Sequence, residues 1–131
     1  MVEPKNKTIV HRETNKHIGT HLVADFWDCD YKYDAERLCH LLINAAHVSN
    51  STVLGSTFYQ FEPTGCTALI LLAESHISAH TWPEYNYIAI DIFTCGKNMK
   101  PQLAVEYLRS CLKPGRVEME TIRRGKTSEK T

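Results

Sequence analysis

The chain has 131 residues, 43% of them hydrophobic and 23% charged, which is typical of one folded globular domain and excludes a largely disordered chain. Fifteen basic residues balance fifteen acidic ones, so the sequence lacks the basic surplus that nucleic-acid binding requires. No apolar run approaches the ~20 residues that span a bilayer, so we expect no membrane association.

Polar residues dominate the N-terminal segment, residues 1–16. This segment has no apolar stretch of the kind found in signal peptides, and we expect it to be a flexible lead-in. The five cysteines are an odd number without CxxC spacing, which argues against a disulfide framework and against a zinc ribbon. Together these observations predict a protein of the reducing cytoplasm.

The first predicted elements are a strand and a helix. Residues 17–26 read as a strand, and residues 33–50 predict a helix with Asp34 as its N-cap. The helix is expected because apolar residues recur at helical spacing and would form one face. These residues are Leu38, Leu41, Leu42, Ala45 and Ala46.

Three strands are predicted in the middle of the chain. Residues 51–62 and 66–74 are strand-like, and the turn signal Pro63-Thr64-Gly65 between them predicts a hairpin. The second run is almost continuously apolar, as expected for a strand covered on both faces, or on one face and an interface. Residues 85–93 alternate, which predicts a strand with two different faces. One of these faces carries Ile88, Ile90 and Ile92.

A second helix and a last strand complete the predicted fold. The helix begins near Pro101 and ends at Pro114-Gly115; residues 116–122 alternate as an edge strand, and residues 123–131 form a polar tail. The order β-α-β-β-β-α-β predicts an α+β two-layer sandwich, an antiparallel sheet with two helices on one face, in one domain of residues 17–122. The expected buried face of the second helix is Leu103, Tyr107, Leu108, Cys111 and Leu112.

Two histidines at the end of the apolar strand have a spacing that metal sites use. His76 and His80 are four residues apart, as two ligands on one helical turn are. The following Trp82-Pro83 disfavours a helix, and no third ligand stands at a recognisable spacing. We therefore expect no metal.

Other chemically interesting residues also have structural explanations. Ser75 is consistent with a turn, and Cys95 with a buried thiol. Phe61 and Trp82 are consistent with the core. Asp91 lies between apolar positions of a strand and must face solvent or have a polar partner. The sequence contains no GxSxG motif, which argues against a serine hydrolase.

Residues 73–96, "AESHISAHTWPEYNYIAIDIFTCG", resemble the signature of the prokaryotic-type S-adenosylmethionine decarboxylases, which are pyruvoyl-dependent enzymes of polyamine synthesis. The family pattern Glu-Ser-His, then His-Thr-Trp-Pro-Glu, then a strand that ends in Phe-Thr-Cys-Gly, is complete here. The upstream segments "HLVADFWDCD" and "STFYQF" extend the resemblance, which covers residues 19–112.

The resemblance implies a proenzyme that cleaves itself between Glu74 and Ser75. Ser75 Oγ would attack the carbonyl carbon of Glu74 and convert the amide into an ester, and His80 would then help to remove the Ser75 α-proton. β-Elimination and loss of ammonia would leave a pyruvoyl group at position 75, with a β chain of residues 1–74 and an α chain that starts at 75. Thr67 occupies the position where the family often carries a processing serine.

The resemblance also implies the chemistry of the mature enzyme. The pyruvoyl ketone would form a Schiff base with the substrate amine and accept the electrons left when CO₂ departs, as pyridoxal phosphate does. Cys95 matches the position of the family's proposed acid. A thiol suits this role, because it mostly keeps its proton at neutral pH and can donate it to the substrate Cα.

The substrate and the assembly are implied in the same way. Phe61 and Trp82 stand where relatives hold the adenine, and aromatic faces also favour a sulfonium cation. Glu84 matches a carboxylate that accepts hydrogen bonds from the ribose hydroxyls. Relatives are dimers with sites near the subunit boundary, so a homodimer of cleaved αβ protomers is expected. Its product would be the aminopropyl donor for spermidine.

Two other functions stay open. Tyr59-Gln60 replace a basic pair of the family and Asn86 replaces a glycine, so a pyruvoyl-dependent ornithine or arginine decarboxylase is an alternative. An aromatic pocket wide enough for adenine would favour S-adenosylmethionine, and a narrower acidic pocket would favour a basic amino acid. A non-catalytic relative is the third hypothesis, although such a protein would have no need of the complete processing signature.

Overall fold

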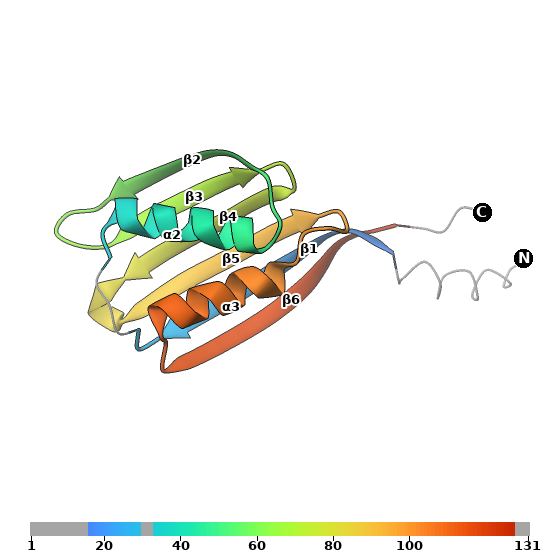
Figure 1. The fold of residues 1–131 in the computed structure, drawn as a ribbon. Coiled ribbons are helices and arrows are strands. Elements are labelled where there is room, and N and C mark those ends of the chain that lie inside the picture. Colours follow the sequence, from blue (N-terminus) through green and yellow to red (C-terminus); the bar gives the residue numbers. More distant parts are fainter. Residues whose placement is uncertain (1–15, 30–32, 128–131) are drawn as a thin grey trace, which may run out of the picture.

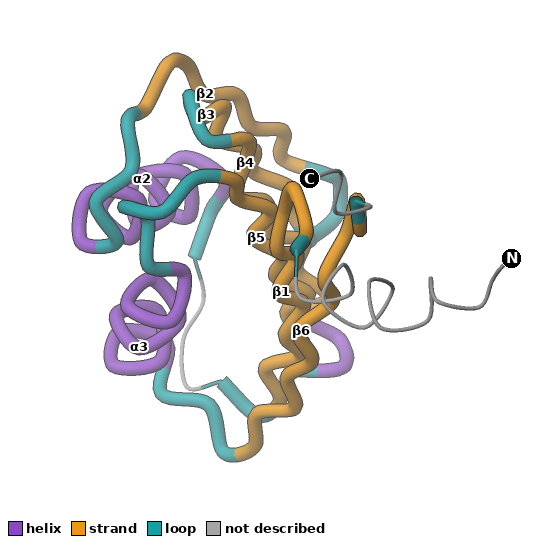
Figure 2. The backbone as a smooth tube through the Cα atoms, turned by 90° about the vertical axis from the view of Figure 1, so that its right-hand side faces the viewer, coloured by secondary structure: helices purple, strands orange, loops and turns teal. Residues whose placement is uncertain are grey.

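Six antiparallel strands form one sheet, and two helices lie on one of its faces (Figures 1 and 2). The computed structural model describes residues 16–29 and 33–127. The strand order across the sheet is β2-β3-β4-β5-β1-β6. In chain order the elements are β1 (His17–Trp27), α2 (Ala35–Val48), β2 (Val53–Gln60), β3 (Cys66–Leu72), β4 (Ser75–Trp82), the 3₁₀ turn η1 (Pro83–Tyr85), β5 (Tyr87–Cys95), α3 (Pro101–Leu112) and β6 (Arg116–Lys126).

The predicted α+β sandwich is confirmed, but the predicted element order lacks one strand. β4 alternates between Ile77 and Ala79, which are buried under the helices, and more polar residues on the opposite face. Only two inward apolar positions, Ile77 and Ala79, mark this strand, so its alternation is weak in the sequence. The last strand also continues to Lys126, beyond the predicted end at residue 122, because it pairs with β1 along its length. The predicted lead-in of residues 1–16 lies outside the described residues except for Lys16.

Helix α2 begins as the sequence predicts. The Asp34 carboxylate accepts a hydrogen bond from the Arg37 backbone N–H at 2.8 Å, which satisfies one of the free donors of the first turn. The side chain of Gln60 adds a second link, because its Oε1 accepts from the Ala35 N–H at 2.8 Å and its Nε2 donates to the Gly65 carbonyl at 2.9 Å. Gln60 therefore ties the start of α2 to the β2–β3 turn.

Helix α3 packs against the core with most of its predicted face. Leu103, expected in the core, is 43% exposed, whereas Ala104 and Val105 are buried. Leu108 and Leu112 are buried as predicted, and Tyr107 and Cys111 are partly buried against the core. The predicted face is therefore confirmed except at Leu103. The helix ends at Leu112, and Lys113 adopts a left-handed conformation before Pro114-Gly115.

The core fills the space between the helices and the covered face of the sheet. The isoleucines of β5 point into it, as the alternation predicts. The opposite face of the sheet is covered by no helix from residues 16–29 and 33–127 (Figure 2). On that face Leu69 and Leu71 of β3 are 41% and 57% exposed, so the described chain covers this strand on the helix side alone, and the predicted interface on the other face stays a prediction. Neither described helix is long and apolar enough to cross a lipid bilayer.

Replacing Leu42 with alanine should lower the free energy of unfolding by about 2–5 kcal/mol, because the lost side chain leaves a cavity in a packed core. Leu42 of α2 is 0% exposed. Urea unfolding followed by circular dichroism measures the change. Val48 of the same helix is 46% exposed, and Val48→Ala should change the stability by less than about 0.5 kcal/mol. Equal losses in the two variants would contradict the packing of α2.

Candidate active site

The turn between β3 and β4 holds the first part of the site. β3 ends at Leu72 and β4 begins at Ser75, and these two residues pair directly, so the connection consists of Ala73 and Glu74 alone. Ser75 has a φ of 146°, in a region that glycine adopts easily and other residues rarely do. The residue that follows the Glu74–Ser75 peptide bond therefore has a strained backbone conformation.

The carbonyl group of Glu74 is fixed by the neighbouring strand. The Cys95 backbone N–H donates to the Glu74 carbonyl oxygen at 3.0 Å, and the Thr52 N–H donates to Glu74 Oε1 at 3.1 Å. The Ala73 N–H donates in turn to the Thr52 carbonyl at 2.9 Å. A fixed donor on a carbonyl oxygen stabilises the negative charge that develops there when a nucleophile attacks. The structure thus brings Glu74, Ser75 and Cys95 together, and the Cys95 side chain is exposed rather than buried.

The remaining predicted residues gather near the other end of β4. His80 Nδ1 lies 3.0 Å from Thr67 Oγ1, because the two residues are directly opposite in the β3–β4 pairing. A pocket of about 310 Å³ opens beside them. Its two aromatic side chains are partly open to solvent, Phe61 being 47% and Trp82 41% exposed. The lining residues are Phe61, Thr64, Gly65, Cys66, Thr67, His80, Thr81, Trp82 and Glu84.

Within one protomer these two groups are well separated. Ser75 and His80 lie on the same strand, five residues apart, which corresponds to roughly 16 Å at a rise of about 3.3 Å per residue. The processing residues predicted together from the sequence therefore form two sets. One set holds the scissile bond and the Cys95 thiol, and the other holds His80, Thr67 and the aromatic pocket.

A third group, not predicted from the sequence, surrounds Asp91 on the uncovered face of the sheet. His21 Nε2 and His76 Nε2 both lie close to Asp91 Oδ2, at 2.6 and 2.9 Å, and Ser78 Oγ donates to Asp91 Oδ1. Burial alone would raise the pKa of the Asp91 carboxyl, but the hydrogen bonds from Ser78, His21 and His76 outweigh it and lower that pKa. Asp91 thus has the polar partners that its position in the strand demanded.

The same cluster supplies the third metal-type ligand that the sequence analysis did not find. The donor atoms of His21, His76 and Asp91 lie within 4.8 Å of one another, and two imidazoles with one carboxylate suit several transition metals. However, the nitrogen–oxygen distances are those of hydrogen bonds, so each donor atom already has a partner.

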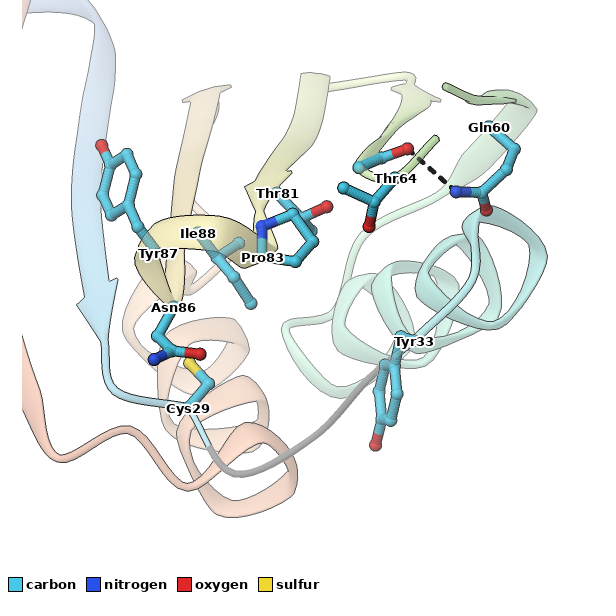
Figure 3. Close-up of a pocket in the computed structure, with 10 residues that line it drawn as sticks. Cys29, Tyr33, Gln60, Thr64, Thr81, Pro83, Asn86, Tyr87 and Ile88 are labelled. Atoms are coloured by element: carbon cyan, nitrogen blue, oxygen red, sulfur yellow. Dashed lines mark hydrogen bonds between the residues drawn. The ribbon is translucent and has the colours of Figure 1, made fainter. Parts of the chain in front are cut away.

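A smaller cavity of about 80 Å³ adjoins the aromatic pocket, between the ends of β4 and β5 and the segment that leads into α2 (Figure 3). Thr64, Gly65 and Thr81 line both spaces. Burial and the charge of Asp28 raise the pKa of the Cys29 thiol to about 11, so this thiol stays protonated at neutral pH. The residues around the cavity are Cys29, Tyr33, Gln60, Thr64, Gly65, Thr81, Pro83, Asn86, Tyr87 and Ile88.

Comparison with known proteins decides the family. The family model described as S-adenosylmethionine decarboxylase matches residues 20–125, which include most of β1, every element from α2 to α3 and nearly all of β6. The chain belongs to the S-adenosylmethionine decarboxylase family. The strained turn and the aromatic pocket therefore lie in a chain of this family.

Individual relatives agree. The chain is 40% identical over 116 residues to the S-adenosylmethionine decarboxylase proenzyme of Thermosipho africanus, covering 87% of this chain and 89% of the relative. It is 43% identical over 109 residues to S-adenosylmethionine decarboxylase proenzyme 2 of Bacillus anthracis, covering 82% and 89%. The crystal structure of the adenosylmethionine decarboxylase from Aquifex aeolicus VF5 superposes with a TM-score of 0.81 at 39% identity, covering 88% of this chain and 98% of that one.

Sequence reasoning missed two features of the site. The Cys95 N–H has no signature in the sequence, because every residue except proline carries such a donor. The contact between His21 and Asp91 joins positions 70 residues apart and depends on strand register. The isolated carboxylate on an alternating strand was the one available signal for this cluster.

Asp91 should make the free energy of unfolding depend on pH in the acid range. Because its folded-state pKa is lower than the ordinary 3.8, its favourable contribution is complete above that value and is lost as pH falls through the folded-state pKa. Unfolding in urea at several pH values measures this, and Asp91→Asn should flatten the decline below about pH 4 relative to wild type. Glu106, exposed on α3, provides the control variant Glu106→Gln. The same acid profile in Asp91→Asn and wild type would contradict the assignment.

Proposed function

We propose that this chain is a proenzyme that cleaves itself between Glu74 and Ser75 and then decarboxylates S-adenosylmethionine with the pyruvoyl group formed at position 75. The observation that carries the proposal is the scissile turn itself, in which a strained serine follows a carbonyl held by the Cys95 N–H. Relatives at about 40% identity are named as proenzymes of this activity, which favours S-adenosylmethionine over ornithine or arginine.

Self-cleavage uses the strain and the fixed carbonyl. Ser75 Oγ attacks the Glu74 carbonyl carbon, and the Cys95 N–H stabilises the oxygen as it becomes negative. Breaking the amide releases Ser75 from its strained conformation, which favours the ester product. Removal of the Ser75 α-proton by His80 then cleaves the ester by β-elimination, which leaves a carboxylate on Glu74 and dehydroalanine at position 75. Water hydrolyses the imine tautomer of this dehydroalanine, which releases ammonia and leaves the pyruvoyl group. The Thr67 hydroxyl supports this step by holding His80 Nδ1.

Position 75 suits a pyruvoyl group, since it lies at the start of β4 opposite Thr94, and the next residue of β5, Cys95, is exposed. When formed, a pyruvoyl group there would supply a ketone for the substrate amine and an acceptor for the electrons left on the substrate carbon when CO₂ departs. The Cys95 thiol donates a proton to the substrate Cα. Phe61 and Trp82 bind the adenine between aromatic faces, and Glu84 accepts hydrogen bonds from the ribose hydroxyls. The product then serves as the aminopropyl donor in spermidine synthesis.

The working unit proposed here is a homodimer of cleaved αβ protomers. The separation of Ser75 from His80 supports it, because His80 of the same chain cannot reach the Ser75 α-proton across about five residues of strand. A second copy facing the uncovered side of the sheet could supply His80 and the aromatic pocket. That side carries exposed apolar residues and a groove of about 550 Å³ across β2, β3 and β4, which favours a protein partner. All five cysteines are free, in keeping with a location in the cytoplasm.

Purified wild-type protein should consist of two chains, one of them ending at Glu74 and the other lighter by one ammonia than a peptide that starts with serine. Ser75→Ala should remain a single inactive chain because it lacks the nucleophile. Intact-mass spectrometry measures both, with Ser110→Ala on the exposed side of α3 as the control that should process normally. Cleavage of Ser75→Ala would assign the wrong nucleophile.

Cys95→Ala should still cleave itself but decarboxylate at least about 100-fold more slowly, because the substitution removes the thiol and keeps the backbone N–H that binds the Glu74 carbonyl. The two readouts are the appearance of the shorter chains on a gel and the release of CO₂. Cys111→Ala is the control. Full activity of Cys95→Ala would remove this thiol from the mechanism.

The proposed substrate is tested by measuring CO₂ release from S-adenosylmethionine, ornithine and arginine side by side with the same mature enzyme. Release from S-adenosylmethionine alone is expected. Preference for ornithine or arginine would refute the substrate assignment while leaving self-cleavage intact.

A further inference from the structure

The hydrogen bonds around Asp91 determine which nitrogen of each neighbouring histidine carries a proton. An ionised carboxylate can only accept hydrogen bonds, and Asp91 Oδ2 has two partners, His21 Nε2 at 2.6 Å and His76 Nε2 at 2.9 Å. Both Nε2 atoms are therefore protonated. Ser78 donates to the other oxygen, so both oxygens of Asp91 are satisfied.

The second nitrogens of these histidines face different groups. Arg124 Nη1, which can only donate, lies 3.2 Å from His21 Nδ1, so this nitrogen accepts and His21 is neutral. His76 Nδ1 lies 3.4 Å from Ser75 Oγ, and in the neutral ring it carries a lone pair. This distance is long for a hydrogen bond, but contacts between a base and its nucleophile commonly shorten when the reaction begins.

We infer that His76, oriented by Asp91, is the base that activates Ser75 for self-cleavage. The inference rests on the proposed function, because it concerns the first step of that reaction. Hydroxyl, imidazole and carboxylate follow one another as in the serine-protease triad, although here the nucleophile and the base are consecutive residues. The unusual φ of Ser75 makes the contact attainable, since successive side chains of a regular strand point to opposite faces.

The step balances without a further reactant. His76 Nδ1 takes the Oγ proton while Oγ forms a bond to the Glu74 carbonyl carbon, and the carbonyl electrons move to the oxygen that the Cys95 N–H binds. When the carbonyl re-forms, the bond from that carbon to the Ser75 nitrogen breaks, and His76 Nδ1–H returns the proton to this nitrogen. The products are an ester and an amine, and His76 is neutral again. Asp91 stabilises the imidazolium in between.

This role differs from that of His80. His76 acts on the hydroxyl of its own chain and forms the ester, whereas His80, held by Thr67, acts on the α-proton and removes the ester. A block at the first step leaves the amide, and a block at the second step leaves the ester. Hydroxylamine distinguishes them, because it cleaves an ester and leaves an amide intact. Loss of either histidine therefore has its own chemical signature.

The test follows full-length precursor made by cell-free translation, with self-cleavage measured over time on a gel. His76→Ala should slow cleavage at least about 100-fold and accumulate a chain that hydroxylamine does not cut. Asp91→Asn should slow it at least about tenfold. His80→Ala should instead accumulate a chain that hydroxylamine cuts after Glu74. Added imidazole should restore part of the rate of His76→Ala, which a purely structural role of this residue would not allow.

His21→Gln is the matched control, because it changes the other imidazole on Asp91 Oδ2 but not the contact with Ser75, and it should cleave within about threefold of wild type. Retained circular dichroism spectra establish that the variants fold, and Asp91→Asn tests the inference independently of His76→Ala. Hydroxylamine cleavage of stalled His76→Ala, or a wild-type rate in that variant, would overturn the inference alone. A wild-type chain that never cleaves would overturn the proposed function and this inference with it.

Discussion

The connection between β3 and β4 is the constraint on which the rest of the site depends. Two residues join strands that pair up to Leu72 and Ser75, and both the main chain and the side chain of Glu74 are held by backbone donors. The strain at Ser75 cannot relax by moving Glu74, because that would break bonds to two other segments. The proposed covalent rearrangement at this bond would release the strain.

The sheet converts sequence spacing into spatial separation. His76 and His80 both point to the uncovered face, yet their neighbours differ, because each step along β4 meets a different row of cross-strand partners. His76 meets Phe93 and lies beside Asp91, while His80 meets Thr67 and opens onto the aromatic pocket. The short strand β4 thus carries two chemically distinct sites, the Ser75 end and the His80 end. The two-fold symmetry of a dimer would bring the Ser75 end of each subunit close to the His80 end of its partner.

Much of this architecture could be predicted from the sequence, and the failures have physical causes. The helix α2, its Asp34 cap and the β5 alternation were confirmed because each depends on local spacing. β4 was missed because its inward apolar positions, Ile77 and Ala79, are few, and Leu103 of α3 was misplaced because the buried face of that helix includes Ala104 and Val105 in its stead. The Asp91 cluster requires knowledge of register between distant strands, and Gln60, interpreted as a departure on the substrate side, instead bonds the start of α2 to the hairpin turn.

The position of β1 in the sheet determines how two fragments cut after Glu74 would associate and refold. β1 lies between β5 and β6, so the two fragments produced by a cut after Glu74 are interleaved, with a strand of the first enclosed by two strands of the second. Neither fragment has a complete sheet of its own, and the hydrogen bonds between paired strands would hold the two fragments together. Once denatured, however, they must find each other in solution, so recovery becomes dependent on concentration. The proposed cleavage would therefore turn a single chain that folds by itself into an assembly of two fragments, whose persistence would depend on how slowly it unfolds.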